Sequence, residues 1–553
     1  MTTATRDFTP PNVDAAYQAV VASLPAADAP ADAWLAAFGR WNELKRWVDG
    51  ETVRRRFREA QDTRDEAARE ANRVVREAID PLVEPHEAHL RAAFLAAACR
   101  PAMAEALGEQ LFVRYQTAQD AYEPANIPLR VQEGQIVADY MRLLASASFD
   151  AGGEALTLSQ GTARLTDPDT GRRRAAWTGV VGWMEAHAEE FHGIYDRLTA
   201  VRHEMAGNLG EATFVPLAYR RMDRSDYGPA EVAAFREEIR THVVPVMARL
   251  RAWQARELGV AVVPAADVEF LPGVALPADV APVDTQLTKA QQLFDRLDPR
   301  MAAHFRRMVD RGLIDLPSRP GKATGAFCSN FEDTAEAAIF CNSTGGVIDV
   351  ITLIHEMGHA IQVWESMPLP AMDLRWPGMD AAEVLSMGLE LLALPEMEVF
   401  FGQDVERFRR IQLVTVLNRL PYMAVVDAFQ HWVYEHPGHT HGAREAAWDD
   451  LWRQFMPGVD YQGQHRTRWM RQLHLFKYPF YYIDYALAEC GALQLWELAR
   501  TDHKAAMDAF MALCALGGTK PLVAFFEGAG LRSPFTPGLL GPLMERVAAE
   551  LGI

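Results

Sequence analysis

The sequence predicts a mainly α-helical protein with one small antiparallel β element. The chain has 553 residues, of which 49% are hydrophobic and 23% charged, as is typical of globular proteins. Apolar residues recur three and four positions apart over most of its length, which indicates amphipathic helices. Two short β-prone runs, 325–331 and 337–343, interrupt that pattern and lead directly into another apolar helical stretch.

The first 150 residues are predicted to form an N-terminal helical region. Within it, residues 33–77 combine apolar steps of three and four with dense charge, which predicts a helical hairpin with solvated faces. Further amphipathic helical segments are predicted at 87–122, 132–147, 177–210 and 229–258.

A connecting region is predicted at 151–285, and a catalytic region at 286–553, within one composite unit. The connecting region is interrupted at 156–171, where turn residues break the helical pattern. It ends in the proline-rich stretch 261–285, which predicts an irregular connection. Residues 286–313 and almost everything after 359 are predicted to be helical.

Charge and cysteine usage narrow the class of protein. With 55 basic and 74 acidic residues the formal charge is −19, which disfavours nucleic acids and anionic membranes as partners. The five cysteines form no CxxC pair and are expected to be reduced thiols. The N-terminus lacks an apolar leader, and no apolar run is long enough to span a bilayer. We therefore expect a cytoplasmic protein.

A metal-binding motif lies in the apolar stretch 347–364. His355 and His359 are four residues apart, so both project from the same helix face and can hold one divalent metal. Glu356, between them, can reach a water on that metal, the arrangement of HExxH zinc hydrolases. The alternative is a pair of histidines on a half-buried helix face.

A third ligand is predicted on the next helix. Glu383, Ser386 and Glu390 share one face of an otherwise apolar segment, and such groups need partners if they are buried. Glu383 is the expected ligand, and Glu390 is better placed to orient an imidazole. Alternatively, Asp380 and Glu383 form a capping box that only ties down the helix start.

The β element suggests how a substrate is held. If the run 337–343 is an edge strand, its backbone can pair with an extended peptide, which makes Ala338 and Phe340 candidate substrate-binding residues. The alternative is a small structural sheet.

An aromatic segment near 480 offers hydrogen-bond donors. Tyr478, Tyr482 and Tyr485 are four and then three residues apart, which fits one helical face, and His474 precedes them. Phenol groups on such a face can donate to a developing oxyanion. The alternative is an aromatic core stripe.

In combination these motifs resemble the thimet-type oligopeptidase family, whose zinc oligopeptidases include neurolysin and bacterial oligoendopeptidase F. The matching residues are 349–362, the segment Glu383-Val-x-Ser-Met-x-x-Glu390, and 480–488. Chain length is most similar to the shorter bacterial enzymes of the Pz-peptidase type. Weaker similarity extends upstream to about residue 150.

The resemblance implies both a site and a fold. Zinc, one ion per chain, would be held by His355, His359 and Glu383, with Glu356 as the base. The substrate-polarising tyrosines would be Tyr482 and Tyr485, with Tyr478 a substrate-binding residue one turn earlier. His474 looks like the family's transition-state histidine, with a spacing to the tyrosines one residue shorter than in eukaryotic members. The implied fold is an elongated helical body split by a deep central channel that admits only short, unstructured peptides.

The sequence thus predicts a zinc endopeptidase of oligopeptides. Two other classes remain open: a metallocarboxypeptidase with the same HExxH core, and a catalytically silent helical peptide-binding protein. Oligomeric state and cleavage-site preference are not predicted.

Overall fold

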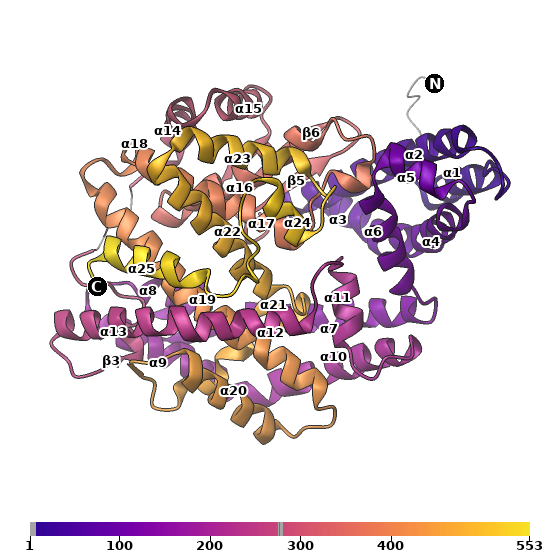
Figure 1. The fold of residues 1–553 in the computed structure, drawn as a ribbon. Helices are drawn as coiled ribbons and strands as arrows, with labels where there is room; N and C mark the ends of the chain where they lie inside the picture. The colour runs from indigo at the N-terminus through magenta and orange to yellow at the C-terminus, as the bar shows by residue number, and fades with distance from the viewer. Residues whose placement is uncertain (1–6, 275, 277–279) are drawn as a thin grey trace.

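The computed structural model describes residues 7–274, 276 and 280–553, and the chain is helical almost throughout (Figure 1). Residues 1–6 of the expected leaderless N-terminus and Pro277 of the proline-rich stretch lie outside the described residues. The mainly α prediction is confirmed. The helices of the first part are α1 (Pro10–Ala22), α2 (Ala31–Gln61), α3 (Glu66–Val74), α4 (Asp80–Ala96), α5 (Arg100–Leu107) and α6 (Glu109–Asp120).

Helices α1–α6 gather at one end of the molecule (Figure 1) around their own aromatic core, which includes Trp34, Trp41, Phe94 and Phe112. The hairpin expected over 33–77 is formed by α2 and α3. The turn between them ends where the Asp65 carboxylate accepts hydrogen bonds from the first backbone amides of α3, as an N-cap should.

The middle of the chain belongs to a second, larger core that continues to the C-terminus. Its helices are α7 (Asn126–Ala145), α8 (Leu158–Arg164), α9 (Thr170–Ala186), α10 (Ala188–Asn208), α11 (Val215–Arg221), α12 (Pro229–Glu238), α13 (Val244–Leu258), α14 (Val283–Leu297) and α15 (Pro299–Asp310). The break expected over 156–171 is wrong for residues 158–164, because Thr157 and Gln160 form a reciprocal capping box that starts α8. The division at residues 150 and 285 stays a prediction.

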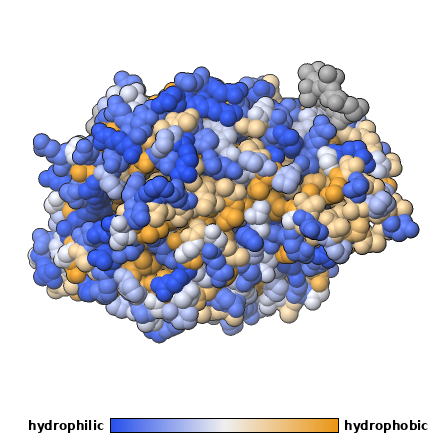
Figure 2. Space-filling model, turned by 45° about the horizontal axis from the view of Figure 1, so that its top comes forward, coloured by the Kyte–Doolittle hydropathy of each residue, from blue (hydrophilic) through white to orange (hydrophobic). Residues whose placement is uncertain are grey.

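The remaining helices surround the HExxH segment. They are α16 (Val347–Ser366), α17 (Met379–Leu392), α18 (Glu398–Phe401), α19 (Val405–Glu435), α20 (His441–Phe455), α21 (Leu473–Lys477), α22 (Tyr482–Thr501), α23 (His503–Leu516), α24 (Leu522–Gly528) and α25 (Leu540–Leu551). None of the helices in the described part of the chain is long and apolar enough to cross a membrane. The face in Figure 2 is largely hydrophilic, with apolar residues gathered in a band across its middle.

The β element is a three-stranded mixed sheet. Its strands are β4 (Ile314–Pro317), β5 (Phe327–Phe331) and β6 (Glu336–Ser343), in the order β4–β6–β5. β5 and β6 form the expected antiparallel hairpin, while β4, which the sequence did not predict, pairs in parallel with β6. Two shorter pairs lie elsewhere, β1 (Ser148–Asp150) with β2 (Ala155–Thr157), and β3 (Val263–Pro264) with β7 (Val459–Asp460).

Ala338 and Phe340 do not lie on an edge strand, the position from which their substrate-binding role was predicted. Both residues belong to β6, the central strand, whose backbone pairs with neighbours on both sides. Their side chains are 2% and 0% exposed and pack with Phe57 of α2. Because successive side chains of a strand point to opposite faces, Ile339 instead joins the larger core on the other face of the sheet. The edge strand beside α16 is β5.

Candidate active site

Two histidines project from α16, one helical turn apart. The helix starts firmly, because the Asp349 carboxylate accepts hydrogen bonds from the backbone amides of residues 344–346 at 2.6, 2.8 and 2.9 Å. His355 and His359 follow two and three turns later, and their ring centroids are 5.1 Å apart. The predicted pair on one face is therefore present.

Glu383 of α17 meets both imidazoles. Its Oε2 atom lies 3.3 Å from Nε2 of His355 and 3.7 Å from Nε2 of His359. One ligand atom from each of these three residues lies within 4.8 Å of the other two. The structure thus brings the three predicted ligands together from two helices.

The competing capping-box interpretation of this segment is wrong. Helix α17 begins at Met379, so Asp380 lies inside the helix instead of at its N-cap. Its carboxylate accepts a hydrogen bond from the Tyr227 hydroxyl at 2.8 Å. The Glu383 side chain faces away from the helix start, toward the histidines and Ser386, whose hydroxyl donates to Oε2 at 2.9 Å.

The donor atoms of His355, His359 and Glu383 fit a divalent metal ion. Nδ1 of His355 lies 2.7 Å from Oε1 of Glu390. A proton on Nδ1 leaves the Nε2 lone pair free to face the cluster, so Glu390 orients the imidazole, as the sequence suggested. Two imidazole nitrogens and a carboxylate oxygen are the donor set of many catalytic zinc sites. His355, His359 and Glu383 would hold the ion.

Glycine at position 358 allows this approach of the two helices. A Cβ atom there would lie 2.7 Å from Cα of Ser386 and 2.9 Å from the carbonyl oxygen of Leu385. Both atoms belong to the backbone of α17, which cannot move aside as a flexible side chain could. Residue 358 therefore sets how closely Glu383 approaches the two histidines.

Gly358→Ala should lower both stability and metal affinity, because the added methyl pushes α17 away from α16. We expect a loss of about 1–3 kcal/mol in the free energy of unfolding, the usual cost of overpacking a tight core. Thermal unfolding and zinc titration would measure the two effects. Gly193→Ala on α10 is the matched control, since a Cβ there meets nothing within 4 Å. Wild-type zinc affinity in Gly358→Ala would contradict this account.

Glu356 lies next to the cluster and is 6% exposed. Burial raises its pKa to about 7, the His355 imidazole lowers it, and the Glu383 carboxylate raises it. A backbone hydrogen bond from Cys328 of β5 also acts on this carboxyl. Glu356 therefore lies between the metal-ligand cluster and the edge strand, and can exchange a proton near neutral pH.

The aromatic segment reaches the same place, although not on one helical face. Helix α21 ends at Lys477 and α22 begins at Tyr482, so Tyr478 lies in the turn between them and is 43% exposed. The one-face prediction is wrong for that residue. The ring centroid of His474 lies 4.6 Å from that of Tyr482 and 5.8 Å from that of Tyr485, so the histidine and these two tyrosines form one cluster.

His474 is held in a defined orientation. The side-chain amide of Gln472 donates to its Nδ1 at 2.8 Å, so the ring proton of the neutral imidazole lies on Nε2. Burial lowers the pKa of His474 to about 4. The Glu383 carboxylate acts on the pKa values of both His474 and Tyr485, which places these two side chains near the metal ligands.

Comparisons with known proteins agree with this geometry. The model of peptidase family M3 matches residues 164–543, and the model of the peptidase M3 N-terminal domain matches residues 7–122. The chain belongs to peptidase family M3. This M3 peptidase is similar to Pz peptidase A in complex with an inhibitor, with a TM-score of 0.92 and 31% identity over 98% of this chain and 97% of that one.

Two further solved structures resemble this M3 peptidase. One is assigned as an oligoendopeptidase F, with a TM-score of 0.92 and 32% identity over 98% of this chain and 96% of that one. The other, assigned as an oligoendopeptidase F of Bacillus anthracis, has a TM-score of 0.88 and 28% identity over 100% and 98% of the two chains. A search of curated protein sequences returned no match. The family and these neighbours support a metalloendopeptidase.

Sequence reasoning missed one residue of this M3 peptidase's site. The Tyr481 hydroxyl donates to Oε1 of Glu383 at 2.5 Å, so the second oxygen of this carboxylate is also held. Tyr481 is 5% exposed. Tyr481 is four residues before Tyr485, and this spacing could have indicated that the two side chains lie close together. The prediction of one continuous helix from Tyr478 to Tyr485 selected Tyr478 instead.

Proposed function

We propose that this M3 peptidase is a zinc-dependent endopeptidase that cleaves internal bonds of short oligopeptides. The single observation that carries the proposal is the convergence of two imidazole Nε2 atoms on one Glu383 oxygen, with the buried Glu356 on the same helix. When bound, zinc would polarise the scissile carbonyl and acidify a water. A cytoplasmic location stays a prediction from the free cysteines.

The edge strand β5 can hold the peptide. One side of its backbone pairs with β6, and Cys328, within β5, hydrogen-bonds to Glu356. An extended peptide that pairs with the free side of β5 would place a backbone carbonyl beside the ligand cluster. Because this pairing uses only main-chain groups, it accepts many sequences, provided that the peptide is unfolded.

The chain's own residues provide the proton path. The Glu356 carboxylate takes a proton from the attacking water and passes it to the leaving nitrogen. The oxyanion donors are Tyr485 and the Nε2–H of His474, because the Glu383 carboxylate acts on the pKa values of both side chains and both therefore lie near the ligand cluster. Tyr482 is the weaker candidate, because the neighbours that act on the pKa of its buried hydroxyl are Tyr422, Arg419 and Arg468 instead of Glu383.

Tyr485→Phe should lower kcat by about 10²–10³-fold with little change in KM, because a donor to the oxyanion acts in the transition state. Steady-state kinetics on one internally quenched peptide would measure both constants. Tyr482→Phe serves as the matched comparison and should have the smaller effect. An unchanged kcat in Tyr485→Phe would remove this residue from the role.

The function itself is tested with an internally quenched peptide whose C-terminus is blocked by an amide. An endopeptidase cleaves it at an internal bond, and a chelator stops the reaction until zinc is restored. A metallocarboxypeptidase would leave the blocked peptide intact and trim the unblocked one. Purified protein that binds no zinc and cleaves neither peptide would instead favour the silent peptide-binding protein.

A further inference from the structure

An exposed tryptophan lies beside the metal-ligand cluster and takes no part in the proposed chemistry. The indole ring of Trp376 lies 6.0 Å from the imidazole of His359, with the two ring planes tilted by 41°. Its side chain is 38% exposed. Large aromatic side chains gain much from burial, so a solvent-facing indole at this point is available to another apolar group.

The loop that carries Trp376 is held firmly. We call residues 367–378, which connect α16 to α17, the α16–α17 loop. From α6, the Arg114 guanidinium donates to the carbonyl oxygens of Asp373 and Trp376 at 2.5 and 2.8 Å. From the other side, the amide of Gly518 donates to the carbonyl of Leu374 at 2.6 Å. The indole therefore sits on a fixed backbone.

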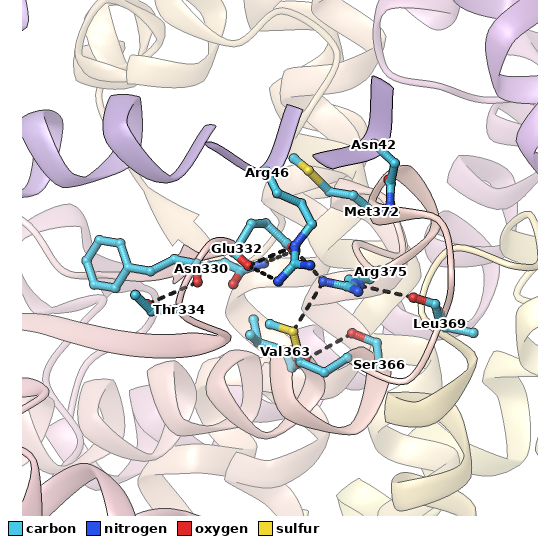
Figure 3. Close-up of polar contacts among 12 residues, drawn as sticks. Asn42, Arg46, Asn330, Glu332, Thr334, Val363, Ser366, Leu369, Met372 and Arg375 are labelled. Atoms are coloured by element: carbon cyan, nitrogen blue, oxygen red, sulfur yellow. Dashed lines mark hydrogen bonds and ion pairs between the residues drawn. The ribbon is translucent and has the colours of Figure 1, made fainter. Parts of the chain in front are cut away.

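The residue before the tryptophan connects the loop to the edge strand. Arg375 is 9% exposed and donates to the carboxylate of Glu332, the residue that directly follows β5, at 2.5 Å. The same guanidinium donates to the carbonyl of Leu369 within the loop. Figure 3 shows the Arg375 side chain of this loop between Glu332 and Leu369. Arg46 of α2 also donates to the Glu332 carbonyl.

These contacts tie the loop that carries the indole to the end of the edge strand. β5 runs past Glu356 and ends at Phe331, and the Glu332–Arg375 ion pair sets the distance from that end to Trp376. A peptide paired with β5 would pass the ligand cluster and reach the indole within a few residues. Its nearest side chain would then meet an apolar surface beside His359.

We propose that Trp376 forms an apolar subsite that binds a large aliphatic or aromatic side chain of the peptide next to the cleaved bond. The inference rests on the proposed endopeptidase function. We assign the preference for a bulky apolar side chain to this subsite because pairing along β5 uses only the peptide backbone and does not distinguish side chains. Arg375 and Arg114 are positioning residues that hold the α16–α17 loop.

The test compares the wild type with Trp376→Ala on two sets of internally quenched peptides. In one set each position around the cleaved bond carries Phe or Leu in turn, and in the other it carries Ala. We expect kcat/KM of the variant to fall about tenfold or more for the bulky residue at one position, and less than about twofold for the alanine peptides. Trp376→Phe should retain most of the preference.

Met141→Ala is the matched control, because Met141 is also 38% exposed but lies on α7, away from the cluster. Equal losses on both peptide sets in Trp376→Ala would indicate general damage and overturn the subsite, as would an unchanged preference. Zinc content and thermal unfolding of each variant identify misfolding. If the wild type cleaves no blocked peptide, the endopeptidase proposal fails; if only the preference is unaltered, the subsite alone fails.

Discussion

Glu356→Gln is expected to abolish peptide hydrolysis while the protein still binds zinc. Glutamine keeps the shape of the side chain but cannot take a proton from the attacking water. General base catalysis contributes about 10²–10⁴-fold, and this carboxyl also serves the leaving nitrogen, so kcat should fall by at least about 10³-fold. Glu356 is not one of the three ligands that converge, so the metal site should be retained.

Stopped assays on an internally quenched peptide, together with zinc analysis of the same sample, would test this expectation. Glu365→Gln is the control on the same helix. Its carboxylate lies 2.7 Å from His304, outside the cluster, so activity should stay near that of the wild type. If Glu356→Gln still hydrolysed the peptide, Glu356 could not be the general base. If the variant lost its zinc, Glu356 would have a structural role instead.

Glu383→Gln is expected to lose both zinc and activity. The substitution removes the negative charge from the one side chain that faces both imidazoles, and an amide oxygen is a much weaker zinc ligand than a carboxylate. We expect zinc affinity to fall by more than about 100-fold, beyond the 10–100-fold typical when only a supporting hydrogen bond is removed. Tyr481→Phe, which removes such a hydrogen bond, should fall within that smaller range.

Competition with a zinc-binding dye would rank these variants. Glu489→Gln on α22 is the matched control, since burial raises the pKa of Glu489 to about 8, and glutamine resembles the protonated carboxyl that burial favours. The Glu489→Gln variant should therefore bind zinc about as tightly as the wild type. If Glu383→Gln held zinc as tightly as the wild type, another residue would have to be the third ligand.

The linear sequence was sufficient to predict contacts that depend on local spacing. His355 and His359 share a helix face because four residues make about one helical turn. The stripe of Glu383, Ser386 and Glu390 was visible for the same reason, and so was the β5–β6 hairpin. Charge content and apolar periodicity likewise predicted a helical protein rich in solvated faces.

The predictions from sequence were wrong where contacts between segments distant in the chain determine the local structure. Strand β4 is separated from β6 by about twenty residues, and its pairing made β6 the central strand, while Phe57 of α2 covers the side chains of Ala338 and Phe340. Phe480 adopts a positive φ of 66°, a conformation that no local pattern favours for phenylalanine. Hydrogen bonds from Arg224 and to Gln430 hold that turn.

By itself, therefore, the sequence determined which residues could bind a metal and exchange a proton, since those properties follow from side-chain chemistry and helical spacing. Only the tertiary structure decided that β5 is the edge strand, that Tyr481 holds Glu383, and that Trp376 faces the site. Each of these depends on long-range contacts: the pairing of β4, the turn at Phe480, and the arginines that hold the α16–α17 loop. Such contacts are selected by the free energy of the whole packed chain, so local patterns carry little sign of them.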